Sequence, residues 1–146
     1  MHVIFRESHG LDATETPVDL DQSPADLVVL SFSDSDLGAF AAGWHLGKTE
    51  LPTLRLANLV GLKHPLSVDT YIDKTLSHAR GILIRLIGGK SYWDYGVQQV
   101  CALAAEKNIA LVIFSIIFNT QSIIMESHFV FVCPIFINHI ILKLIS

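Results

Sequence analysis

Short apolar runs alternate with amphipathic stretches along the first 113 residues of the chain. The runs are rich in Val, Ile and Leu and are bounded by polar residues. This pattern is typical of strands that are buried on both faces of a parallel sheet. We therefore expect strands near residues 2–5, 26–31, 54–58, 81–87 and 109–114.

Helices are expected between the later strands, because apolar residues recur there at helical spacing. Their expected first or capping residues are Ser33 or Asp34, then Ser67, then Trp93 or Tyr95. Asp69 would fall in the first turn of the second helix, where a negative charge complements the helix dipole. Strands that alternate with helices predict an α/β fold, a parallel-sheet, flavodoxin-like βαβ unit of three layers.

The composition of the chain changes sharply near Phe114. Residues 1–113 hold nine of the ten Lys and Arg residues and thirteen of the fourteen Asp and Glu residues. We therefore predict an N-terminal α/β domain over 1–113 and an atypical, irregular hydrophobic tail over 114–146. The abrupt change favours foreign or frameshifted sequence for this tail, and the alternatives are a packed segment and a membrane anchor. Asn119, Gln121 and Asn138 interrupt its apolar runs, which makes a membrane anchor the least favoured.

Charge and cysteine content narrow the possible functions. The net charge is −4, and Lys and Arg do not cluster, so no nucleic-acid-binding surface is predicted. Cys101, Cys133 and the seven histidines show no metal-ligand spacing, so no metal site is expected. The first eleven residues lack the apolar run of a secretory signal, which favours reduced thiols and a cytoplasmic location.

The best candidate for a ligand site is the loop over residues 88–96, GGKSYWDYG. It follows a predicted strand and precedes a helix, which is where open α/β sheets bind ligands. Helix-start amides there suit an anionic group, and aromatic rings suit a flat ligand. The candidate residues are Gly88, Gly89, Ser91, Trp93 and Tyr95. The alternative is a Gly-Gly turn whose aromatic side chains pack against neighbouring elements.

Two further residues are candidates. His64 follows a strand and precedes Pro65, so it is placed to bind a metal or a carboxylate, or else to hydrogen-bond the backbone of a turn. Arg85 lies inside the apolar run GILIRLI, and a charge within a buried strand needs a partner. We expect that partner to be Asp94 or a group on a neighbouring domain.

Four segments carry a resemblance to a known family: LRLANL, LKHPLSVDTYI, TLSHAR and RLIGGKSYWDYG. They resemble the N-terminal region of the large subunit of aerobic cobaltochelatase, in the family that includes the large subunit of magnesium chelatase. The resemblance is most specific over residues 51–96 and stops near Phe114.

The resemblance implies a part in aerobic cobalamin biosynthesis. Family complexes insert cobalt into hydrogenobyrinic acid a,c-diamide, a tetrapyrrole, and use cobalt, ATP and magnesium. It also implies a corrin substrate and AAA+ type partner subunits that hydrolyse the nucleotide. The residues that handle the metal lie largely beyond the resembling part of the family, so we expect no catalytic residue and no firmly bound cofactor in this chain.

The chain is therefore predicted to be a fragment of an ATP-dependent cobalt-chelating ligase that is inactive alone. One alternative is a small α/β module that binds a tetrapyrrole or a partner subunit without catalysis. The other is an accessory protein that the hydrophobic tail tethers to a membrane.

Overall fold

A computed structural model of the chain describes residues 16–47, 51–119 and 122–126. Its centre is a five-stranded sheet with the order β2-β1-β3-β4-β5. The strands are β1 (Leu27–Ser31), β2 (Leu54–Asn58), β3 (Gly81–Ile87), β4 (Ala110–Asn119) and β5 (Ser122–Glu126). Strands β1 to β4 are parallel, and β5 returns antiparallel beside β4.

The predicted α/β fold with a parallel sheet is confirmed. Four predicted strands appear, each starting within one residue of its expected position, and the strand expected at residues 2–5 lies outside the described residues. Strand β4 is longer than predicted, because it continues from Phe114 to Asn119 and then pairs with β5. The sheet therefore crosses the expected boundary between domain and tail, and that boundary stays a prediction.

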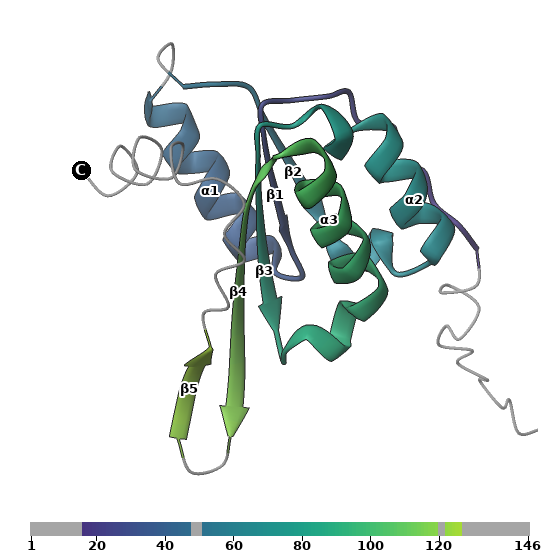
Figure 1. The fold of residues 1–146 in the computed structure, drawn as a ribbon. Helices are drawn as coiled ribbons and strands as arrows, with labels where there is room; N and C mark the ends of the chain where they lie inside the picture. Colours follow the sequence, from purple (N-terminus) through teal and green to yellow (C-terminus); the bar gives the residue numbers. More distant parts are fainter. Residues whose placement is uncertain (1–15, 48–50, 120–121, 127–146) are drawn as a thin grey trace, which may run out of the picture.

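Helices cover both faces of the sheet, as expected for three layers. Helix α1 (Asp34–Gly47) lies on one face, and α2 (Pro65–Lys74) and α3 (Asp94–Lys107) lie on the other (Figure 1). The strand order explains this split. The connection from β1 to β2 runs toward one edge of the sheet. The later connections, from β2 to β3 and from β3 to β4, run toward the other edge. Right-handed crossovers in opposite directions place their helices on opposite faces.

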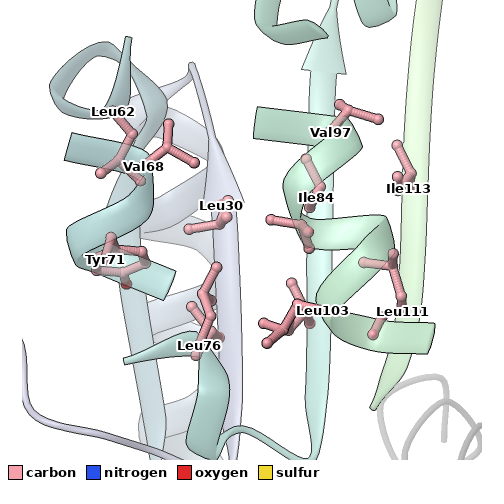
Figure 2. Packing of buried hydrophobic residues seen from close by; sticks show 14 of the residues in the cluster. Leu30, Leu62, Val68, Tyr71, Leu76, Ile84, Val97, Leu103, Leu111 and Ile113 are labelled. Carbon is pink, nitrogen blue, oxygen red and sulfur yellow. The ribbon is translucent and has the colours of Figure 1, made fainter. Parts of the chain in front are cut away.

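The core lies between the sheet and the pair α2 and α3. Figure 2 shows Val68 and Tyr71 of α2 facing Leu30 of β1, and Val97 and Leu103 of α3 beside strands β3 and β4. The strand residues on this face, such as Leu30, Ile84 and Ile113, are at most 1% exposed. Burial of such side chains contributes about 1.5–3 kcal/mol each, so this face supplies much of the stability of the fold.

The start of α2 differs from the prediction. Its N-cap is His64, whose Nδ1 accepts a hydrogen bond from the Leu66 amide at 3.1 Å, and Pro65 is the first helical residue. Ser67 is not the cap: it is buried inside the helix, and its Oγ accepts a hydrogen bond from the Val18 amide at 2.7 Å. Asp69 consequently lies beyond the first turn. Proline favours the first helical position because it needs no amide hydrogen there.

Gln22 fastens the segment before β1 to the edge of the sheet. Its Nε2 donates to the Leu56 carbonyl of β2 at 2.9 Å, and its Oε1 accepts from the Tyr71 hydroxyl of α2 at 2.7 Å. The Thr75 hydroxyl donates to the Gln22 carbonyl at 2.7 Å. The first of these bonds occupies the Leu56 carbonyl on the edge strand β2, which would otherwise be open to pairing with another strand.

Tyr71 should make the fold less stable as the pH rises through the alkaline range. Its side chain is 3% exposed, and burial raises the pKa of its hydroxyl well above the ordinary value. Above pH about 10 the unfolded chain releases this proton while the folded chain keeps it, so the free energy of unfolding should fall by up to about 1.4 kcal/mol per pH unit. Urea denaturation between pH 8 and pH 11 measures this slope.

The control is Tyr71→Phe, which removes the titrating group. It should lower stability at pH 8 by about 1 kcal/mol, since Gln22 loses a hydrogen-bond partner, and should then show a shallower decline above pH 10. Equal slopes for the two proteins would show that Tyr71 ionises normally in the folded chain.

Candidate functional site

The carboxyl ends of β1 and β3 form the centre of the candidate site. The two strands are neighbours in the sheet, with Ser31 in register with Arg85. The chain leaves β1 for α1 on one face and leaves β3 for α3 on the other. In open α/β sheets, ligands bind at such a switch point, outside the carboxyl ends of the strands. The predicted loop after β3 is therefore in the expected place.

Gly88 and Gly89 give this loop its shape. Their φ angles are +92° and +94°, a region that side-chain-bearing residues rarely adopt. A Cβ on Gly88 would also approach the ring of Tyr92 to 2.5 Å. The turn therefore requires glycine on conformational grounds, and the short 3₁₀ helix η5 (Lys90–Trp93) follows it into α3.

The two predicted aromatic residues of the loop both make hydrogen bonds within the protein, but only Trp93 is buried. Trp93 is 5% exposed, and its Nε1 donates to the Leu62 carbonyl at 2.7 Å. The Tyr95 hydroxyl donates to Asp69 Oδ1 at 2.8 Å, and this hydrogen bond raises the pKa of Tyr95. These contacts tie the start of α3 to α2 and to the 3₁₀ helix η3 (Leu59–Leu62). Trp93 therefore has the geometry expected for the packing alternative, whereas Tyr95 is bonded to α2 and remains 38% exposed.

The exposed residues of the loop are Lys90, Ser91, Tyr92, Asp94 and Tyr95, and of these Asp94 and Tyr95 are hydrogen-bonded within the protein. Tyr92 is 66% exposed and stands over Gly88, so its ring is available to a ligand outside the carboxyl ends of the strands. The sequence prediction included Ser91 but missed Lys90 and Tyr92. The sequence offers three aromatics in the run YWDY, and no periodic signal says which one points outward.

Arg85 makes an ion pair with α1. Its Nη1 lies 2.5 Å from Asp36 Oδ1, and Asp36 Oδ2 accepts a hydrogen bond from the Ser31 hydroxyl at 3.0 Å. The expectation that Arg85 pairs with Asp94 was wrong, because Asp94 follows the loop toward the other face, where it accepts from Gln98 at 2.8 Å. The network fixes the first turn of α1 on the sheet and leaves 38% of the Arg85 side chain exposed.

The helix start beside Arg85 is capped as predicted. Ser33 Oγ accepts from the Asp36 amide at 3.3 Å, and the Ser33 amide donates to Ser31 Oγ at 3.1 Å. Asn58, at the end of β2, donates to Asp34 Oδ1 at 2.6 Å. The carboxyl ends of β1, β2 and β3 are therefore joined to the N-terminus of α1 by polar side chains.

His64 accepts a hydrogen bond from the backbone at the start of α2. This agrees with the alternative that His64 hydrogen-bonds the backbone of a turn. Within the described part of the chain, no three His, Cys, Asp or Glu residues gather in a group able to hold a metal ion. None of the helices in the described ranges has the length and apolar character needed to cross a membrane.

The strand order and the loops at the switch point define an α/β unit of the flavodoxin-like class. No protein-family model matches the chain. Over 104 residues it is 41% identical to the aerobic cobaltochelatase subunit CobN of Pseudomonas aeruginosa and 38% identical to that of a Sinorhizobium species. Over these residues the chain is homologous to the CobN subunits of aerobic cobaltochelatase.

The chain spans only a small part of these relatives. Each match covers 71% of this chain and 8% of the relative. A solved structure, the catalytic subunit of cobaltochelatase from Mycobacterium tuberculosis, is 26% identical with a TM-score of 0.45, over 67% of this chain and 7% of its own.

Proposed function

We propose that this chain is the N-terminal α/β unit of a cobaltochelatase large subunit, as a fragment of the complex that inserts cobalt into hydrogenobyrinic acid a,c-diamide. The observation that carries the proposal is the 41% identity over 104 residues. In a chain of 146 residues, any continuous stretch of 104 residues must include residues 43–104. The match therefore includes β2, α2, β3 and the loop after β3.

The unit contributes to the complex without inserting cobalt by itself. It spans 8% of the length of its relatives, and its described residues offer no group of metal ligands. In the proposed arrangement, AAA+ type subunits hydrolyse ATP, and the remainder of a large subunit handles the metal. A cytoplasmic location belongs to the same proposal.

At the carboxyl edge of the sheet, we propose that the loop over residues 88–92 contacts the corrin substrate. The exposed ring of Tyr92 offers an apolar surface to a flat macrocycle. The exposed Lys90 offers a positive charge to its carboxylate groups. The same contacts would serve the alternative function, a binding module without catalysis.

The experiment is a chimera in which residues 16–119 of this chain replace the matching segment of the Pseudomonas aeruginosa CobN subunit. Together with the partner subunits, ATP, cobalt and the diamide corrin, the chimera should insert cobalt, whereas the 146-residue chain in its place should insert none. A chimera that folds but is inactive, or a chain that is active alone, would contradict the proposal.

The loop is tested in the same chimera. Replacing both Lys90 and Tyr92 with alanine should raise the KM for the corrin by about tenfold, because the lost ion pair and the lost aromatic contact are each worth roughly 0.5–1 kcal/mol. The matched control is Val60→Ala, which truncates another exposed side chain, in the 3₁₀ helix η3. An unchanged KM in the double variant would remove the loop from the substrate site.

A further inference from the structure

The loop over residues 88–92 is fixed at its start by its own backbone. Gly88 and Gly89 turn the chain at the end of β3, with φ angles of +92° and +94°. The Tyr92 amide then donates to the Gly89 carbonyl at 3.3 Å, which closes the first turn of η5. The place of the exposed Tyr92 ring therefore depends also on how the residues that follow it are held.

Two hydrogen bonds hold the residues that follow the loop. Trp93 donates to the Leu62 carbonyl inside the core, whereas the Tyr95 hydroxyl donates to Asp69 Oδ1 at 2.8 Å nearer the surface. Tyr95 is 38% exposed and Asp69 is partly exposed, so little of the core depends on this second bond. Its acceptor is a carboxylate, and such charge-assisted bonds are stronger than bonds between neutral groups.

Asp69 lies beyond the first turn of α2, where a negative charge no longer complements the helix dipole. Its carboxylate instead reaches the first turn of α3, 26 residues later in the sequence. Because η5 leads directly into α3, Tyr95 follows Tyr92 by about one helical turn. A shift of Tyr95 relative to α2 would therefore be passed on to Tyr92, and to Lys90 before it.

We propose that Asp69 is a positioning residue for the corrin-contacting loop, which it holds through the Tyr95 hydroxyl. This inference rests on the proposed function. By fixing the start of α3 against α2, the bond keeps the exposed side chains of Lys90 and Tyr92 in one place. A ligand binds more weakly when only a fraction of the molecules hold the binding conformation, so loss of the bond should weaken corrin binding.

Amide hydrogen exchange in the 146-residue chain tests the positioning without the corrin. Tyr95→Phe and Asp69→Ala each remove the bond. Each should make the Tyr92 amide exchange about fivefold faster, because one hydrogen bond no longer opposes local opening. Asp69→Asn keeps an acceptor oxygen and should have a smaller effect. The matched control is Asp73→Ala, which removes another exposed carboxylate from α2 and should leave this exchange unchanged.

An unchanged rate at the Tyr92 amide in Tyr95→Phe would overturn the inference. A Tyr92 amide that is already unprotected in the wild-type chain would do the same, because the loop would then move with the bond in place. So would an equal acceleration at the Ile109 amide, which donates to the Ala104 carbonyl at 3.0 Å at the other end of α3. In that case the bond would stabilise the whole helix rather than the loop.

The chimera described above tests the consequence for the substrate. Tyr95→Phe should raise the KM for the corrin about threefold and leave kcat unchanged, because the bond acts on binding. In the chimera that already carries Lys90→Ala and Tyr92→Ala, Tyr95→Phe should add no further increase, because it acts through those two side chains.

An additive increase in that background, or an unchanged KM in Tyr95→Phe alone, would reject Asp69 as a positioning residue. Failure of the proposed function is distinguishable from this result. It appears as a chimera that inserts no cobalt, or as an unchanged KM when Lys90 and Tyr92 are replaced, whatever the exchange rates of the 146-residue chain.

Discussion

Replacing Trp93 with alanine is expected to lower the free energy of unfolding by about 3–5 kcal/mol, the usual cost of deleting a large buried aromatic side chain. The ring is 5% exposed and packs in the cluster that also contains Leu62 and Val97. Its Nε1 donates to the Leu62 carbonyl at 2.7 Å, and the substitution leaves that buried carbonyl without its partner. Urea denaturation followed by far-UV circular dichroism measures the loss.

Tyr92→Ala is the matched control for Trp93→Ala. It removes the adjacent aromatic ring, which is 66% exposed, and should change stability by no more than about 0.5 kcal/mol. If Trp93→Ala does not fold, Trp93→Phe keeps part of the buried ring, loses the bond to Leu62 and leaves a small cavity, and should cost about 1–3 kcal/mol. A loss below 1 kcal/mol in Trp93→Ala would reject the packing role and reopen the prediction that this ring binds a ligand.

The strands could be predicted from the sequence because each follows from a local pattern. In GILIRLI and DLVVLS, runs of apolar residues, broken in the first only by Arg85, indicate burial on both faces, and the parallel sheet follows from their alternation with helices. The N-cap at Ser33 is also local, since its hydroxyl bonds an amide three residues away. The start of α2 was missed although Pro65 carried the signal: a proline at the first helical position makes His64 the cap.

The candidate site could be placed from the sequence, but its contacts could not. Gly88-Gly89 after a predicted strand was enough to locate the loop at the switch point. The partner of Arg85 is Asp36, which is 49 residues away in the sequence and lies on α1, so no spacing rule reveals it. Which aromatic ring turns inward depends on how η5 meets η3, and only the tertiary contact between Trp93 and Leu62 decides that.

Gly96→Ala should destabilise the protein, although alanine usually favours a helix over glycine by about 1 kcal/mol. Gly96 lies in the first turn of α3, and a Cβ there would overlap the Cε2, Cζ2 and Cδ2 atoms of the Trp93 ring. The ring is buried and hydrogen-bonded, so it has little room to move. Overpacking of this kind costs about 1–3 kcal/mol, which should outweigh the gain in helix propensity.

The control is Gly43→Ala in α1, where nothing lies within 4 Å of the added Cβ. That substitution should raise the free energy of unfolding by up to about 1 kcal/mol. Adding Gly96→Ala to Trp93→Ala completes a double-mutant cycle, since removal of the ring removes the overlap. In that background Gly96→Ala should become neutral or stabilising. If Gly96→Ala instead stabilises the wild-type chain, as Gly43→Ala should, the Trp93 ring does not lie against Gly96 at the start of α3.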